Sequence, residues 1–312
     1  MKWWAEAGAN IALIKYMGKT EGNVPTNASL SYLLPHLKSE VEILPGSSAD
    51  RWESLGGFKL EGREIDKFMG FFSRLKEVMD LRGYYIVRSR NSFPKGTGLA
   101  SSASSFAALT MAAGEVARSQ NGRAWSQEAL AQISRLGSGS SCRSFFGPWA
   151  VWDKESVRPA ALAVENLVHQ AIVLEEAKKE VSSSEAHQRV QTSLNFEGRV
   201  DRAETRLRIL TEALSSGEWE TAFRVTWAEF WDMHSLFETS ARPFGYMTPQ
   251  SCELLQELMG VWRTKGDGPL VTMDAGPNIH LLYREDQIEM AQQLRRDIFS
   301  HFRVISSYDK QI

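Results

Sequence analysis

The sequence contains a glycine- and serine-rich run, Pro94-Lys95-Gly96-Thr97-Gly98-Leu99-Ala100-Ser101-Ser102-Ala103-Ser104-Ser105, which leads directly into the Ala-, Leu- and Met-rich stretch 106–117. Glycines permit turns that point successive N–H groups at a ligand, and the free N–H groups of a helix start favour a bound phosphate. Serine hydroxyls in the first turn can also ligate Mg²⁺. The run lacks the Gly-Lys-Ser/Thr of the Walker loop. From spacing alone, a phosphate site and a helix start packed on a sheet are equally good interpretations.

The segments around this run predict strands and one helix. Apolar residues at 11–14, alternation at 41–44 up to a turn at Pro45-Gly46, and β-prone residues at 84–87 indicate strands. Between residues 65 and 79 the apolar positions are three or four apart, which is typical of a helix.

The later part of the chain predicts more helices. Ser126 is a candidate N-cap and Gly137 a candidate helix stop, and 271–273 and 279–282 are expected to be strands beside a turn. Helical spacing over 218–238 gathers aromatic residues into one stripe, which we interpret as core or dimer packing. The irregular mixture of strands and helices predicts an α+β fold, with a domain seam near residues 177–195.

Composition excludes several classes of protein. The 312 residues suggest two domains or one large one, and a net charge of -2 with 43% hydrophobic residues is typical of a globular protein. No Lys/Arg run points to nucleic acid, and no apolar stretch approaches the roughly 18 residues that cross a bilayer. Cys142 and Cys252 stand far apart and form no Cys-x-x-Cys pair. We therefore expect a cytoplasmic enzyme with a small-molecule substrate and without disulfides or a transition metal.

Three further segments carry residues that suit chemistry on an anion. Gly137-Ser138-Gly139-Ser140-Ser141-Cys142-Arg143-Ser144 joins hydroxyls to one Arg, a planar donor to carboxylate or phosphate. Asp274 precedes a Gly-Pro turn, and Lys15, Tyr16 and Lys19 follow an apolar strand that contains Asn10. Each segment alone is better explained by a loop, a turn or a polar strand end.

In combination, these four segments are more specific than any one of them. Asn10-Ile11-Ala12-Leu13-Ile14-Lys15-Tyr16-Met17-Gly18-Lys19, the 98–104 loop, the 137–143 loop and Met273-Asp274-Ala275-Gly276-Pro277-Asn278 occur in that order over nearly the whole chain. The set resembles the mevalonate diphosphate decarboxylases, a branch of the GHMP kinase superfamily. The resemblance implies an N-terminal domain like ribosomal protein S5 domain 2 over residues 1–180 and a ferredoxin-like C-terminal domain over 181–312. It also implies a homodimer, with the active site in the cleft between the domains.

The resemblance further implies a reaction. ATP and mevalonate 5-diphosphate would give isopentenyl diphosphate, ADP, phosphate and CO₂, with Mg²⁺ accompanying ATP. Asp274 would deprotonate the tertiary 3-hydroxyl for attack on the γ-phosphate, Lys15 would assist at the reacting centre, and Arg143 would hold the substrate carboxylate. Asn10 would orient the Arg143 guanidinium.

The resemblance assigns the remaining site residues to two groups. Expected to bind the substrate are Tyr16, Lys19, Ser138, Gly139, Ser140, Ser182 and Ser183. Expected to hold the ATP phosphates are Gly96, Gly98, Leu99, Ala100, Ser101, Ser102 and Ser104, with Ser102 as a candidate Mg²⁺ ligand.

Some residues depart from the family pattern. Met17 stands where the family often has Trp, and Ala186-His187 stand near a usual Gly-Met. We expect local repacking there, and an inert buried thiol at Cys142 rather than a reactive one.

Three other functions remain open from the sequence. They are decarboxylation of mevalonate 5-phosphate, phosphorylation of the 3-hydroxyl alone, and metabolite binding without catalysis. Asp274 and Arg143 count against phosphorylation alone. The presence of all four polar segments counts against metabolite binding without catalysis.

Overall fold

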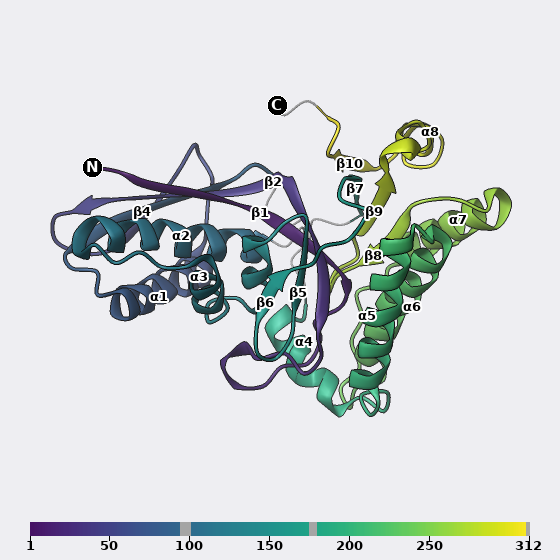
Figure 1. Cartoon of the computed structure of the whole chain (residues 1–312), viewed down its shortest axis with the longest axis horizontal. Helices are drawn as coiled ribbons and strands as arrows, with labels where there is room; N and C mark the ends of the chain where they lie inside the picture. Colours follow the sequence, from purple (N-terminus) through teal and green to yellow (C-terminus); the bar gives the residue numbers. More distant parts are fainter. Residues whose placement is uncertain (94–100, 175–179, 310–312) are drawn as a thin grey trace.

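The first half of the chain forms a six-stranded sheet covered by helices. The computed structural model describes residues 1–93, 101–174 and 180–309. The strands run in the order β3-β4-β2-β5-β6, and β1 pairs antiparallel with β2. Helices α1, α2 and α3 lie on one side of this sheet (Figure 1). The elements of this half are β1 Trp3–Ile14, η1 Glu21–Asn23, β2 Ser29–Gly46, β3 Arg51–Ser54, α1 Gly62–Met79, β4 Tyr84–Asn91, α2 Ser101–Asn121, α3 Gln127–Ser134, η2 Gly139–Phe145, β5 Trp149–Trp152 and β6 Val157–Pro159.

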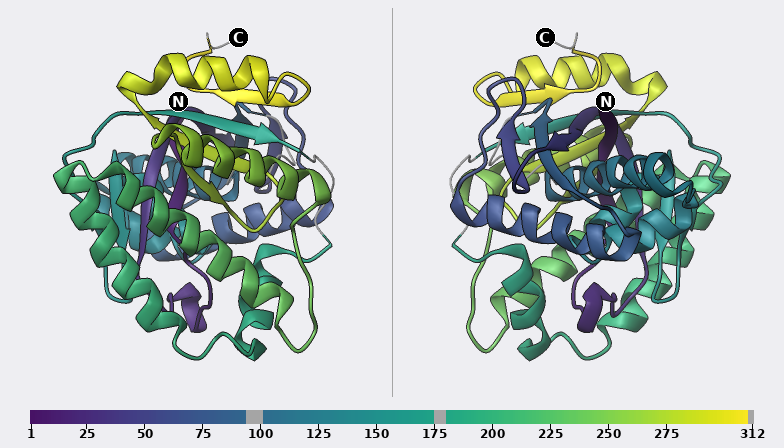
Figure 2. Two further views of the ribbon diagram at one scale, coloured as in Figure 1. Left: turned by 90° about the vertical axis from the view of Figure 1, so that its right-hand side faces the viewer. Right: turned by 90° about the vertical axis from the view of Figure 1, so that its left-hand side faces the viewer.

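The second half forms a four-stranded antiparallel sheet in the order β10-β7-β9-β8. Helices α5, α6 and α7 stand beside β8 (Figure 1), and α8 lies next to β10 at the top of both views in Figure 2. The elements are β7 Leu167–Val173, α4 Ser183–Arg189, η3 Val190–Thr192, α5 Arg199–Ser216, α6 Trp219–Glu238, α7 Pro249–Lys265, β8 Leu270–Met273, β9 Ile279–Arg284, η4 Glu285–Gln287, α8 Ile288–Asp297 and β10 Arg303–Ser306.

Strand β1 belongs to both hydrophobic cores. Ala5 and Ala7 pack with α1 and α2, whereas Ala9 and Ile11 pack with the second sheet and its helices. The change occurs at a register shift between Gly8 and Ala9. One long strand therefore carries the chain from the first core into the second and ends at Ile14, directly before Lys15.

Most of the predicted elements are confirmed, and several extend beyond the predicted span. The helical spacing at 65–79 corresponds to α1, the stretch 106–117 to the middle of α2, and the aromatic stripe to α6. Ser126 caps α3, because its hydroxyl accepts a hydrogen bond of 3.2 Å from the Ala129 N–H. The stripe residues Trp219, Phe223 and Phe230 are buried, which confirms the core interpretation. The α+β prediction is also confirmed, since the helices lie apart from two largely antiparallel sheets.

The change from the first sheet to the second occurs before the domain seam predicted near residues 177–195. Strand β7, at Leu167–Val173, pairs with β9 and β10 and so lies in the second sheet. The predicted boundary at residues 180 and 181 stays a prediction. Within the described ranges no helix is both long and apolar enough to span a bilayer.

Candidate active site

Asp274 lies directly after β8, with its carboxylate held by a lysine. Lys15 Nζ donates a hydrogen bond of 2.7 Å to Asp274 Oδ1. The Asp274 main-chain carbonyl accepts hydrogen bonds from the Gly276 N–H at 2.8 Å and from His234 Nε2 at 3.2 Å. The Lys15 side chain is 2% exposed, whereas that of Asp274 is 32% exposed. The carboxylate is therefore fixed from behind and open in front, as a base that must reach a substrate requires.

Asp274 and Lys15 each favour the charged form of the other. Burial raises the pKa of Asp274, but the attraction of Lys15 outweighs it and holds that pKa below its ordinary value. For Lys15, burial has the opposite effect and lowers the pKa, and the nearby charge of Asp274 offsets only part of this shift. Asp274 is therefore ionised at neutral pH and ready to accept a proton.

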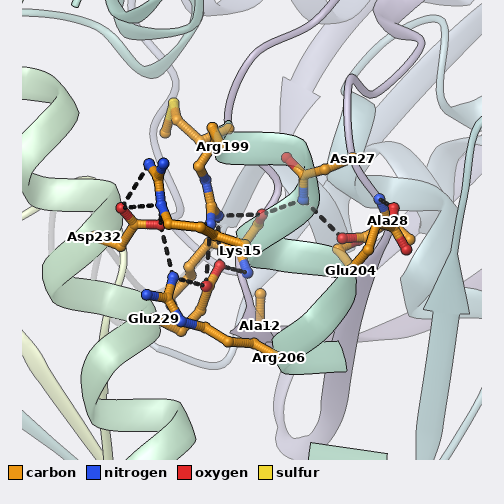
Figure 3. A network of polar contacts seen from close by, with 12 residues as sticks. Ala12, Lys15, Asn27, Ala28, Arg199, Glu204, Arg206, Glu229 and Asp232 are labelled. Atoms are coloured by element: carbon orange, nitrogen blue, oxygen red, sulfur yellow. Dashed lines mark hydrogen bonds and ion pairs between the residues drawn. The ribbon is translucent and has the colours of Figure 1, made fainter. Parts of the chain in front are cut away.

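The backbone of Lys15 is held by a buried ionic network (Figure 3). The Lys15 N–H donates to Glu229 Oε1 at 2.9 Å, and the Lys15 carbonyl accepts from Asn27 Nδ2 at 3.0 Å and from Arg199 Nη2 at 3.2 Å. Glu229 on α6 and Arg199 on α5 form a fully buried ion pair. The helices of the second half thus fix the end of β1, and with it the lysine that faces Asp274.

Arg143 is a buried cation for which the described residues provide no ion-pair partner. Its side chain extends from η2, and the residue is 4% exposed. Its Nε donates to Asn10 Oδ1 at 3.1 Å and its Nη1 to Ser29 Oγ at 2.8 Å. Asn10 Nδ2 in turn donates to Ser144 Oγ at 2.8 Å and to the Ser140 carbonyl at 3.2 Å. Because a buried unpaired charge is costly, this arrangement points to an anionic ligand.

Tyr16 and Lys19 both contact residues of α4. The Tyr16 ring packs against Trp152, at a centroid distance of 4.6 Å, and against His187, at 4.3 Å. Lys19 Nζ donates to Asn23 Oδ1 at 2.9 Å and to Ser184 Oγ at 3.1 Å, with no carboxylate partner in the described part of the chain. Arg143 and Lys19, two basic side chains predicted to bind substrate, therefore have no carboxylate partner among the described residues.

The Ser138–Ser140 segment contacts Tyr16 and the start of α2. A Cβ placed on Gly139 would lie 2.7 Å from the Tyr16 hydroxyl oxygen, so only glycine fits there without displacing the ring. Ser138 Oγ donates to Ser102 Oγ at 3.5 Å, which brings the two glycine- and serine-rich segments together. The sequence-predicted convergence of these two segments is thus present.

Other predicted residues are arranged differently. Ser182 caps α4, since its Oγ accepts from the Glu185 N–H at 3.2 Å, and Ser183 is exposed, so Ser184 is the serine that reaches Lys19. The Ser104 hydroxyl is buried, 2.7 Å from Ser39 Oγ on β2. Outside the described residues lie Gly96, Gly98, Leu99 and Ala100, and for Ser101 only the helical backbone is described.

The comparisons with known proteins identify the family. A model of the diphosphomevalonate decarboxylase-like N-terminal domain matches residues 7–163, and one of the mevalonate 5-diphosphate decarboxylase C-terminal domain matches residues 170–311. The chain belongs to the diphosphomevalonate decarboxylase family. Its GHMP kinase fold is that of the solved decarboxylases, and the predicted resemblance is confirmed.

Individual relatives agree with this assignment. A crystal structure of a mevalonate diphosphate decarboxylase from Legionella pneumophila is 44% identical, with a TM-score of 0.92, and the match covers 98% of this chain and 100% of that one. A structure of MDDEF in complex with MVAPP, AMPPCP and magnesium is 30% identical, with a TM-score of 0.87 and 98% and 96% coverage. The diphosphomevalonate decarboxylase of Ganoderma lucidum is 29% identical over 93% of this chain and 80% of its own length. The relatives also include the phosphomevalonate decarboxylase of Haloferax volcanii, 24% identical over 95% and 93%.

Magnesium fits the donors of this decarboxylase-family site. The described residues contain no group of three or more His, Cys, Asp or Glu that could hold a metal. Mg²⁺ needs no such group, because it commonly binds through substrate phosphates and one or two protein oxygens. The exposed Ser102 hydroxyl and the open carboxylate of Asp274 are oxygen donors of that kind.

Four residues of the site were not found from the sequence: Glu229, Arg199, Ser184 and His187. Glu229 lies within the aromatic stripe, and a buried acid on an apolar face was the signal that could have revealed it. His187 was noted only as a departure from the family pattern, yet its Nδ1 accepts the Gly18 N–H at 3.0 Å. Cys142 is buried as predicted, and burial raises the pKa of its thiol to about 12, which favours the unreactive protonated form.

Proposed function

We propose that this chain catalyses the ATP-dependent decarboxylation of mevalonate 5-diphosphate to isopentenyl diphosphate, with release of ADP, phosphate and CO₂. The observation that carries this proposal is the buried Arg143, which lacks a carboxylate partner among the described residues and shares a polar site with Asp274. A substrate carboxylate would satisfy Arg143, and a substrate hydroxyl would meet Asp274.

The first step is phosphoryl transfer to the tertiary hydroxyl. Asp274 accepts the hydroxyl proton as the oxygen attacks the γ-phosphate, and such positioned proton transfer is typically worth about 10²–10⁴ in rate. Lys15, held 2.7 Å from Asp274, places a positive charge beside the developing negative charge. When bound, Mg²⁺ would neutralise phosphate charge, with Ser102 as a proposed ligand.

The second step is elimination. The 3-phosphate leaves with its bonding electrons, the carboxylate carbon–carbon bond supplies the electrons of the new double bond, and CO₂ departs. Arg143 fixes the carboxylate in the required orientation, and Asn10 holds the guanidinium by its hydrogen bond to Nε.

The remaining assignments rest on the family resemblance. We assign the substrate diphosphate to Tyr16, Lys19 and the 138–140 segment, with Ser182 and Ser183 as predicted neighbours. The ATP phosphates are assigned to the 96–104 segment. The domain division at 180 and 181, a homodimer and a cytoplasmic location belong to this proposal.

The test compares two substrates. ADP and CO₂ are measured with mevalonate 5-diphosphate and with mevalonate 5-phosphate under the same conditions. We expect turnover of the 5-diphosphate with equal amounts of both products. A clear preference for the monophosphate would change the substrate, ADP without CO₂ would indicate a kinase, and absence of both products would indicate a binding protein.

A further inference from the structure

His187 lies on α4, with one ring nitrogen bound to the backbone that follows β1. Its Nδ1 accepts a hydrogen bond of 3.0 Å from the Gly18 N–H. A ring nitrogen that accepts a hydrogen bond carries no proton, so the neutral ring has its hydrogen on Nε2. Burial lowers the pKa of His187 to about 3, which keeps the ring neutral near pH 7. The Gly18 N–H therefore selects the tautomer in which Nε2 is a donor.

The ring of His187 is held in one position, and its second nitrogen is left over. Besides the bond to Gly18, the ring packs on that of Tyr16 at a centroid distance of 4.3 Å, and the residue is 7% exposed. A flip of the ring would break the bond to Gly18. Within the part of the chain that the structure describes, the Nε2–H has no hydrogen-bond partner. A nearly buried donor without a partner is costly, so this N–H points to a ligand with an acceptor.

The surroundings of His187 favour an anionic ligand. The charges of Lys19 and Arg143 both act on the ring and lower its pKa further. Ser184, three residues before His187 and on the same face of α4, accepts a hydrogen bond of 3.1 Å from Lys19 Nζ. Ser184 is exposed and Lys19 is half-buried, so the region beside the ring is open to solvent. A neutral N–H at this place adds a donor for an anion without adding a third repelling charge.

We propose that His187 is a substrate-binding residue, whose Nε2–H donates a hydrogen bond to a phosphate oxygen of mevalonate 5-diphosphate beside Lys19. The proposal rests on the proposed function, which assigns the substrate diphosphate to Tyr16, Lys19 and the 138–140 segment. A diphosphate has enough oxygens to accept from Lys19 and His187 at once, whereas the substrate carboxylate is assigned to Arg143. Because His187 departs from the family pattern, this contact is a property of this chain.

Two substitutions separate the roles of the two ring nitrogens. In His187→Asn the amide oxygen takes the place of Nδ1 and can accept from the Gly18 N–H, but nothing replaces the Nε2–H. In His187→Gln the amide N–H reaches the place of Nε2, and the acceptor for Gly18 is lost. Calorimetric titration with mevalonate 5-diphosphate, without ATP, should give a Kd about tenfold higher for His187→Asn and within about threefold of the wild type for His187→Gln, since hydrogen bonds to charged groups are the stronger kind. The Kd for ATP should stay within about twofold in both variants.

A second measurement needs no folded variant for its result. In the wild type, ¹⁵N NMR of the six histidine rings reports which nitrogen carries hydrogen, and the His187 signals are those that disappear in the variants. We expect His187 to show hydrogen on Nε2 in the free protein. On saturation with mevalonate 5-diphosphate the Nε2 resonance should shift, whereas the Nδ1 resonance should change little because its bond to Gly18 persists.

A purely structural role of His187 predicts the reverse order, because Asn keeps the bond to Gly18 and Gln loses it. That order would overturn the proposal, as would equal losses in the two variants, a wild-type Kd in both, or an Nε2 resonance that substrate leaves unchanged. The control is Gln188→Asn, at the next residue of α4, which is exposed and should keep the wild-type Kd. Failure of the proposed function is a separate result, because the wild type would then release neither ADP nor CO₂.

Discussion

Arg143 is bound by an amide oxygen and a hydroxyl oxygen, neither of which carries charge. Such partners fix the direction of a guanidinium without neutralising it. The residue therefore keeps its affinity for an anion while it is held in one orientation, which is what recognition of a single carboxylate needs. Asp274 has the complementary arrangement, with Lys15 behind the carboxylate and open space in front.

Replacement of Arg143 by Ala should therefore affect the decarboxylase substrate and spare ATP. We expect kcat/KM for mevalonate 5-diphosphate to fall by at least about 10²-fold, in line with loss of a charge-assisted contact to a desolvated carboxylate. ATP affinity, measured by titration without the second substrate, should change less than about threefold. Arg158→Ala, at an exposed arginine on β6, is the control. Equal losses for both ligands would contradict the assignment of Arg143.

Replacement of Asp274 by Asn removes the base and keeps the size of the side chain. We expect product formation to be abolished, because the amide cannot take the hydroxyl proton, and substrate binding to stay within roughly tenfold. Rapid-quench measurement of ADP and equilibrium binding of the substrate separate the two effects. Ordinary turnover by this variant would remove Asp274 from the mechanism.

At the scale of elements, the contact between η2 and the segment after β1 depends on one glycine. A Cβ on Gly139 would meet the Tyr16 hydroxyl oxygen at 2.7 Å and Cε1 at 2.9 Å, and any shift of Tyr16 would disturb its ring contacts with Trp152 and His187. Gly139→Ala should lower kcat/KM for the diphosphate substrate about tenfold by displacing Tyr16, and should lower Tm.

The matched control for this glycine is Gly70→Ala on α1. A Cβ at Gly70 meets nothing within 4 Å, and alanine is the better helix former, so this variant should keep its activity and gain slightly in stability. Steady-state kinetics and thermal unfolding of both variants check the prediction. Unchanged kinetics for Gly139→Ala would show that Tyr16 is not needed in its observed place.

Local sequence patterns predicted the elements whose conformation depends mainly on residues nearby in the chain. The spacing in α1, the cap at Ser126 and the stripe of α6 depend on neighbours within a few residues, and they were read correctly. The seven-residue η2 was not predicted, because its conformation depends on tertiary contacts. The contact between Lys15 and Asp274 was expected only through the family resemblance, since 259 residues separate them.

At the scale of the whole molecule, the two halves meet at the end of β1. Arg199, Arg202 and Arg206 on α5 bind Asp232 on α6, and two of them also bind Glu229. This cluster supports the Lys15 backbone directly (Figure 3), so the stability of the second half and the geometry of the active site depend on the same ionic contacts.

Asp232 should make stability depend on acid pH. Burial raises the pKa of Asp232, but Arg202, Arg199 and Arg206 outweigh it and leave that pKa below its ordinary value. A carboxyl with a lowered pKa stabilises the fold above the pKa of the unfolded chain, about 3.9, and loses this contribution as pH falls through the folded pKa. Urea unfolding at pH 6 and pH 3 should show a smaller loss for Asp232→Asn than for the wild type. An equal loss would contradict this role.

Glu229 links the active site to the helices of the second half, because its carboxylate binds Arg199 and accepts the Lys15 N–H. Glu229→Gln leaves the fully buried Arg199 with one ion-pair partner fewer, and breaking a buried pair from one side typically costs about 3–5 kcal/mol. We expect a loss of that size in urea unfolding, and a lower kcat even where the variant is fully folded, because the end of β1 loosens. Glu220→Gln, on the same helix and in an exposed pair with Arg224, should change stability by less than about 1 kcal/mol. If Glu229→Gln unfolds more easily but retains wild-type kcat when folded, the network stabilises the chain without positioning Lys15.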